Sequence, residues 1–189
     1  MRINLKWMIV ALAVIALLGT GSVSASPPAP SPESPAYLSW RASTLLAQIQ
    51  TEGAGLRSNA ETLATFASNP HYSRQSHGYY LDRVKGHINA VGERTAELQR
   101  ILHAVLPWQQ QAITEVTSHA AQVAASTQAA ILHLQENQLW LFASEYRHHL
   151  TTIADRSADM KQTVDKFLDY GKTQQKLQQL EKDLELAGD

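Results

Sequence analysis

A single carboxylate, Glu52, stands in a helical stripe of the sequence where an apolar side chain is expected. A buried carboxylate needs an ionic or hydrogen-bonding partner, and without one it takes up a proton. Counting across the predicted turns puts Glu52 level with His149, so we predict a buried polar layer in which Glu52 is paired with His149 or assisted by an arginine. Alternatively, Glu52 lies at the edge of the stripe in water. The adjacent Gly53 and Gly55 predict a kink or a close helix contact there.

Histidine is the second residue type that could do chemistry, because the chain has eight. Metal ligands must converge on one point, and a di-metal site in a helical bundle needs two Glu-x-x-His repeats and two further glutamates. Glu145 and His148 form one such repeat, while Glu115 and His119 share a helix face without completing a site. We therefore predict no metal site and no cofactor.

Haem binding is an alternative that the sequence leaves open. Counting across turns puts Met160 and His103 at nearly the same height, and a protein can hold haem between a methionine and a histidine. However, the two residues fall on helices that are diagonal in a simple bundle, and His103 lies beside its apolar stripe. Met160 is equally well explained as an ordinary core residue.

Aromatic and imidazole side chains are expected to gather at one end of the fold. The loop after the first predicted helix, together with the chain around the end of the third, contributes His71, Tyr72, His77, Tyr79, Tyr80, His133 and Trp140. Tyrosine and tryptophan combine apolar area with a hydrogen-bonding tip, so this end could bind a small ligand, a glycan or a metal ion, or it could simply close the core. Trp40 and Trp108 are expected together at the opposite end, with the same two interpretations.

No catalytic motif accompanies these residues. The sequence has no serine, histidine and acid in a recognisable turn, no glycine-rich phosphate loop and no His-Glu-x-x-His zinc motif. We predict that the protein is not an enzyme. Catalysis by polar groups around Glu52 is kept as a third hypothesis, behind two kinds of binding.

Long helices must position these side chains. Apolar residues recur at steps of three and four, which places them on one face of a helix, and stripes of this length need comparably long helices to cover them. Connections between the helices are short, which makes successive helices antiparallel neighbours. The sequence predicts an all-α, up-down-up-down antiparallel four-helix bundle with helices at 35–67, 79–106, 107–135 and 139–171.

An amphipathic C-terminal extension, residues 172–189, follows Gly171. Leu177, Leu180 and Leu184 recur there among lysine, glutamine and glutamate. Because the four predicted helices already match in length at Gly171, the extension must fold back over the end of the bundle, pair with another chain or remain a frayed helix. It is the candidate interaction segment.

The first residues resemble a Sec-type signal peptide. An apolar run from Trp7 to Leu18 follows two basic residues and leads to small residues ending at Ala25. The run is shorter than the roughly 20 residues that a membrane-spanning helix requires, so we predict cleavage after residues 1–25, with retention as an anchor as the alternative. Residues 26–34 are a proline-rich linker. We expect a periplasmic or extracellular protein.

Composition restricts the partners further. The chain has no cysteine, which excludes disulfides, thiolate metal sites, covalent haem attachment and a lipid-modified cysteine. Its formal charge of -1 and its lack of a basic stripe argue against nucleic acid. We expect one bundle domain, residues 35–171, acting as a protein-interaction or structural module, alone or as a homo-oligomer. Carriage or sensing of a small ligand, metal or non-covalent haem is the alternative.

Overall fold

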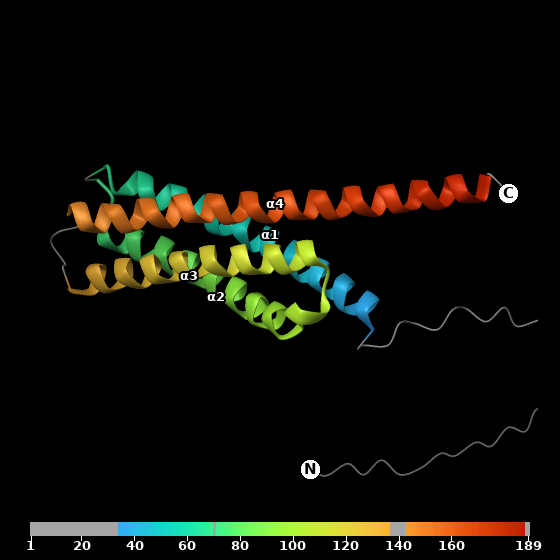
Figure 1. Cartoon of the computed structure of the whole chain (residues 1–189). Helices are drawn as coiled ribbons and strands as arrows, with labels where there is room; N and C mark the ends of the chain where they lie inside the picture. Colours follow the sequence, from blue (N-terminus) through green and yellow to red (C-terminus); the bar gives the residue numbers. More distant parts are fainter. Residues whose placement is uncertain (1–33, 70, 137–142, 188–189) are drawn as a thin grey trace, which may run out of the picture.

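The structure is a computed structural model that describes residues 34–69, 71–136 and 143–187. These residues form four long helices and one short 3-10 helix, and no strand occurs among them. In chain order the elements are α1 (Pro35–Phe66), α2 (Arg74–Ile101), η1 (Leu102–Ala104), α3 (Pro107–Glu136) and α4 (Ser144–Ala187) (Figure 1). The predicted all-helical fold, with four helices packed against each other, is confirmed.

Each long helix packs mainly against two others. α1 lies against α2 and α4, α3 lies against the same two helices, and α1 and α3 touch only slightly. At one end of the two helices Trp108 of α3 contacts Tyr170 of α4, and at the other end His133 of α3 stacks on Tyr146 of α4. Residue numbers therefore rise along α3 in the direction in which they fall along α4. α4 is the longest helix, and its C-terminal part extends beyond the others (Figure 1).

The core fills the space between the four helices. It consists of apolar side chains at helical spacing, and fully burying each large one contributes about 1.5–3 kcal/mol to folding. The stripes that the sequence predicts supply most of this core, and Leu46 of α1 joins it from beside the predicted stripe. Its largest fully buried members are Leu45, Leu46, Ile49, Leu56, Leu63, Leu81, Leu98, Ile113, Tyr146, Leu150, Ile153 and Met160.

α2 begins at Arg74, a full turn before the predicted start at residue 79. The hydroxyl of Ser73 caps the helix by accepting a hydrogen bond from a backbone N–H at 3.2 Å. Gly78, where the sequence places the end of the loop, lies inside the helix instead. The additional turn carries His77 into the core, where its side chain is fully buried.

α4 continues through Gly171 to Ala187 as one helix. A glycine inside a helix costs about 1 kcal/mol relative to alanine, which is too little to end a helix whose flanking turns are good helix formers. Beyond Gly171 the helix is exposed and does not fold back over the bundle. The described helix starts at Ser144, and Leu139, its predicted first residue, lies outside the described residues.

The predicted signal peptide and all but the last residue of the predicted linker lie outside the described residues. The last linker residue, Ser34, caps α1, because its hydroxyl accepts a hydrogen bond from the backbone N–H of Tyr37 at 3.2 Å. Pro35 follows at the first helical position, where an N–H would have no partner within the helix. Of the helices that the structure describes, none combines the length and apolar character needed to cross a membrane.

Candidate functional site

Glu52 lies on α1 and pairs with two residues of α2. One carboxylate oxygen is 2.9 Å from Nδ1 of His87, and the other is 3.6 Å from a guanidinium nitrogen of Arg94. The side chain is 24% exposed, so the carboxylate is at the edge of the core and within reach of water. The predicted arginine is present, but His87 takes the place that the sequence assigned to His149.

His149 lies at a different level of the bundle. Gly53 of α1 faces the side chain of Met160. A Cβ built on Gly53 would lie 3.5 Å from the methyl carbon of Met160. His149 precedes Met160 by eleven residues on α4, which corresponds to about 16 Å along the helix axis. The described α4 starts at Ser144, five residues later than expected, which accounts for about half of this difference of eleven residues.

Gly55 brings α1 and α2 close beside Glu52. A Cβ at Gly55 would lie 2.5 Å from Cε1 of His87, so the missing side chain makes room for the imidazole. One turn further along α1, the amide oxygen of Asn59 accepts a hydrogen bond from Nε of Arg83 at 3.1 Å. The close helix contact predicted from the glycines is therefore present at Gly55. These polar groups join α1 to α2.

A buried imidazole and a buried phenol meet near the first turns of α2 and α4. Nδ1 of His77 is 3.0 Å from the hydroxyl oxygen of Tyr146, and both side chains are fully buried. Burial lowers the pKa of His77 and raises the pKa of Tyr146, so both groups stay neutral near pH 7. Nε2 of His77 has no hydrogen-bond partner among the described residues.

Ring contacts fill the rest of this end of the bundle. His133 stacks on Tyr146 with 5.1 Å between ring centroids, Phe66 meets His77 edge-on, and Tyr72 stacks on Phe66. The rings close the end of the core. The sequence prediction of this end did not include Phe66 and Tyr146. The signal that could have found them is an aromatic side chain in the last turn of α1 and another in the first turn of α4.

Not all of the predicted members of the aromatic end join the buried group. Tyr80 does, because it packs edge-on against Phe66. His71 and Tyr79 are exposed, and the ring of Tyr79 lies beneath the guanidinium of Arg83. Trp140 falls in a part of the chain that the structure does not describe. The observed group is thus smaller and more deeply buried than the predicted one.

The residues considered above as alternatives for metal and haem binding do not form a site among the described residues. Within the described part of the chain, no group of three or more potential ligands is placed to hold a metal ion. Glu145 and His148 are both exposed on α4. Met160 is fully buried next to Gly53, whereas His103 is exposed in η1, so these two side chains do not form an axial pair for haem.

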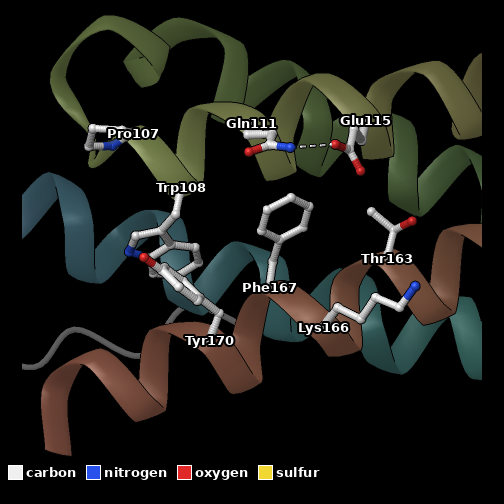
Figure 2. Close-up of a pocket in the computed structure, with 8 residues that line it drawn as sticks. All are labelled: Pro107, Trp108, Gln111, Glu115, Thr163, Lys166, Phe167 and Tyr170. Atoms are coloured by element: carbon white, nitrogen blue, oxygen red, sulfur yellow. Dashed lines mark hydrogen bonds between the residues drawn. The ribbon is translucent and has the colours of Figure 1, made fainter. Parts of the chain in front are cut away.

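An open groove of about 630 Å³ runs between the beginning of α3 and the later part of α4 (Figure 2). Phe167 projects from α4 toward α3, and the rings of Trp108 and Tyr170 lie next to each other, with 6.2 Å between their centroids (Figure 2). These three aromatic side chains make the groove apolar. Its remaining lining residues are Pro107, Gln111, Glu115, Thr163 and Lys166.

Sequence reasoning missed this groove because it expected Trp108 beside Trp40. Trp40 is 58% exposed, and its ring contacts Tyr37. Trp108 packs instead on Gly171, where a Cβ would lie 2.7 Å from the ring. The available signal was Gly171 itself, the residue at which the fourth helix was predicted to end.

Past the groove, α4 continues as the overhang, which we define as residues 172–187. Leu177, Leu180 and Leu184 are 49%, 49% and 74% exposed. At 3.6 residues per turn, they lie on the same face of the helix as Tyr170 of the groove. An exposed apolar stripe therefore leads from the mouth of the groove along the overhang.

No known protein family, curated protein or solved structure matches the chain. The candidate sites differ in how accessible their side chains are to another molecule. The carboxylate of Glu52 is paired across α1 and α2, and the His77 and Tyr146 pair is enclosed by the core. The groove and the overhang instead present apolar side chains at the surface.

Proposed function

We propose that this chain is an exported, up-down-up-down antiparallel four-helix bundle that acts by binding another protein chain through its overhang. Residues 1–25, with the features of a Sec leader, and the proline-rich linker support export. The opposite order of contacts along α3 and α4 supports the antiparallel arrangement. Binding without catalysis is the function that the exposed surface favours.

The observation that carries the proposal is the exposed leucine stripe of the overhang. Burying a fully exposed leucine side chain gains about 1.5–3 kcal/mol. Leu177 and Leu180 are half-exposed and Leu184 is more exposed, so each offers a partner a part of this gain. A helical segment of this length without a neighbour is marginal in water, and a docked partner would stabilise it. Exposed apolar patches bordered by polar residues commonly mark protein interaction sites.

Photo-cross-linking in the native host tests the proposal. A photoreactive amino acid replaces Leu180 on the stripe or, as the matched control, Lys182 on the opposite face of the same helix. We expect a cross-linked protein adduct from position 180 and little from position 182, because a partner covers the stripe alone. Equal yields at the two positions, or no adduct from position 180, would contradict binding through the overhang.

Mass spectrometry of the exported protein tests the predicted leader. Cleavage after Ala25 leaves Ser26 as the first residue of the mature chain. A mass that includes residues 1–25 would show that the leader is kept as an anchor. The binding proposal for the overhang holds in either case, because the two segments are tested separately.

A second candidate function, carriage of a small aromatic or apolar ligand, is favoured by the groove. Its volume of about 630 Å³ lies within the range of roughly 300–1,000 Å³ that is usual for ligand pockets. Trp108 and Tyr170 offer ring faces, and Lys166 offers a charge at the rim. Native mass spectrometry of the protein from its host would show a retained ligand, which Trp108→Ala should remove. A ligand retained equally by this variant would lie elsewhere.

A further inference from the structure

We infer that the partner of the overhang is a second copy of this chain, paired antiparallel so that Leu177 of one copy faces Leu180 of the other. The inference rests on the proposed function, because it names the partner that the overhang binds. It draws on two properties of the overhang, its apolar seam and the charges that flank the seam. Together they select one register of an antiparallel pair.

The seam has the spacing of a two-stranded coiled coil. Its residues recur at alternating steps of four and three along one face of the helix, the pattern by which two helices interlock. All of them are exposed, and beyond Tyr170, whose ring contacts Trp108, no described element of the chain covers the seam. Its members are Tyr170, Thr173, Leu177, Leu180, Leu184 and Ala187.

Charges on one flank of the seam match when two overhangs run in opposite directions. Lys176 and Asp183 lie seven residues apart, so they occupy equivalent positions beside the seam. In an antiparallel pair, residues at this position face one another across the interface. With Leu177 opposite Leu180, Lys176 lies opposite the partner's Asp183, and Asp183 lies opposite the partner's Lys176. Both contacts on this flank therefore join opposite charges.

Moving the two helices by one heptad removes this match. A shift in one direction places Asp183 against the partner's Asp183, and a shift in the other places Lys176 against the partner's Lys176. Like charges facing each other across an interface are unfavourable and select against these alternatives. On the other flank, the preferred register places Glu181 against the partner's Gln174, so no repulsion arises there.

Parallel pairing is disfavoured by the part of α4 that belongs to the bundle. The outward face of α4 continues the line of the seam through Lys166 and Asp159. Two parallel helices in register would bring each of these charges against its own copy. In the antiparallel pair, Ala187 instead reaches the partner's Tyr170 at the end of the bundle. In this arrangement Lys166 and Asp159 of one copy do not face the same residues of the other copy.

Sedimentation equilibrium of the mature full-length chain tests the inference, at concentrations up to about 1 mM because the interface is small. We expect a reversible dimer for the wild type and a monomer for Leu180→Glu, with helical circular dichroism retained in both. Lys176→Glu and Asp183→Lys each place two like-charged pairs in the dimer. Each should therefore raise the dissociation constant about tenfold or more at low salt.

The decisive measurement mixes the two charge variants. A dimer of one Lys176→Glu chain and one Asp183→Lys chain joins opposite charges at both contacts, so the mixture should associate about as well as the wild type. A parallel pair would instead leave Asp183→Lys unaffected, because position 183 would have no charged counterpart. Lys182→Glu, on the far face of the helix, is the matched control and should leave the dissociation constant unchanged.

The outcomes separate this inference from the proposed function. A wild type that stays monomeric overturns self-pairing, as does an unaffected Asp183→Lys variant or a mixture that fails to associate. If the chain is monomeric but position 180 still cross-links to a different protein in the host, the proposed function stands and this inference fails. If neither dimer nor cross-link forms, both fail.

Discussion

Gly171 of α4 lies against the indole of Trp108, and a Cβ at this glycine would lie only 2.7 Å from both Cη2 and Cζ2 of the ring. Trp108 belongs to the first turn of α3, so the contact fixes the beginning of α3 on α4. Gly171 is also the last buried residue of α4 before the overhang. One small residue thus marks where the bundle ends and the unaccompanied helix begins.

We predict that Gly171→Ala destabilises the bundle by up to about 2 kcal/mol. Moving the indole away from a well-packed position costs about 1–3 kcal/mol, and alanine as a better helix former offsets about 1 kcal/mol of this cost. Urea unfolding followed by circular dichroism measures the difference. Gly92→Ala is the matched control, since nothing lies within 4 Å of its added Cβ, and it should stabilise α2. Similar effects of the two substitutions would show that the Trp108 indole moves away from position 171 at little cost in stability.

The helices themselves could be predicted because their signal is local. Apolar residues at steps of three and four determine which face is buried, and this pattern needs no knowledge of neighbouring helices. The same holds for the overhang, where Leu177, Leu180 and Leu184 follow one stripe into solvent. The beginning of α2 was missed because the cap residue Ser73 is a weaker signal in the sequence than the glycine at position 78.

Contacts between helices were harder to predict because they depend on register. Met160, eleven residues past the predicted His149, lies near the level of Glu52, and the start of α4 five residues later than expected explains only part of this shift. His87, the observed partner of Glu52, carries no mark in the sequence that distinguishes it from the other histidines. The His87 ring lies in the space left by Gly55. The sequence predicted a close helix contact at this glycine but not that His87 would make it.

We predict that Gly55→Ala destabilises the protein by about 1–3 kcal/mol, since its Cβ would lie 2.5 Å from the His87 ring and push it off Glu52. Removing the ring removes the clash. In a His87→Ala background, Gly55→Ala should therefore be neutral or stabilising. A double-mutant cycle by urea unfolding measures this coupling. Equal effects of Gly55→Ala in the two backgrounds would show that His87 is not what the glycine accommodates.

Gln109 is a buried polar side chain that ties α1 to the turn before α3. Its amide nitrogen donates to the backbone oxygen of Ser39 at 2.7 Å and to the hydroxyl of Ser43 at 2.9 Å, and its oxygen accepts from the backbone N–H of Leu106 at 3.0 Å. We predict that Gln109→Leu costs about 2 kcal/mol or more, because it leaves buried groups unpaired. Chemical denaturation measures the loss. Gln122→Leu, at an exposed position of α3, should change stability by less than about 0.5 kcal/mol. Equal losses would contradict a structural role for Gln109.

The buried pair of His77 and Tyr146 should make folding sensitive to mild acid. Burial holds the pKa of His77 below the ordinary histidine value of about 6.5, while the unfolded chain keeps that value. Above pH 6.5 both states are neutral at this position, and the residue adds no pH dependence. As the pH falls below 6.5, the unfolded chain gains a proton that the folded chain does not bind. The free energy of unfolding must therefore decrease, by up to about 1.4 kcal/mol per pH unit from this group, until the lowered pKa of the folded state is reached.

We predict that His77→Gln flattens this dependence, although it lowers stability at pH 7.5 by disturbing the contact with the Tyr146 hydroxyl. The measurement compares urea unfolding of the wild type and the variant between pH 7.5 and pH 5.5. Their difference in free energy should shrink as the pH falls, because only the wild type pays for excluding a proton at position 77. His71→Gln, at an exposed histidine in the loop before α2, is the control and should keep the wild-type slope. Parallel pH profiles for the wild type and His77→Gln would mean that the buried imidazole takes up its proton as readily as it does in the unfolded chain.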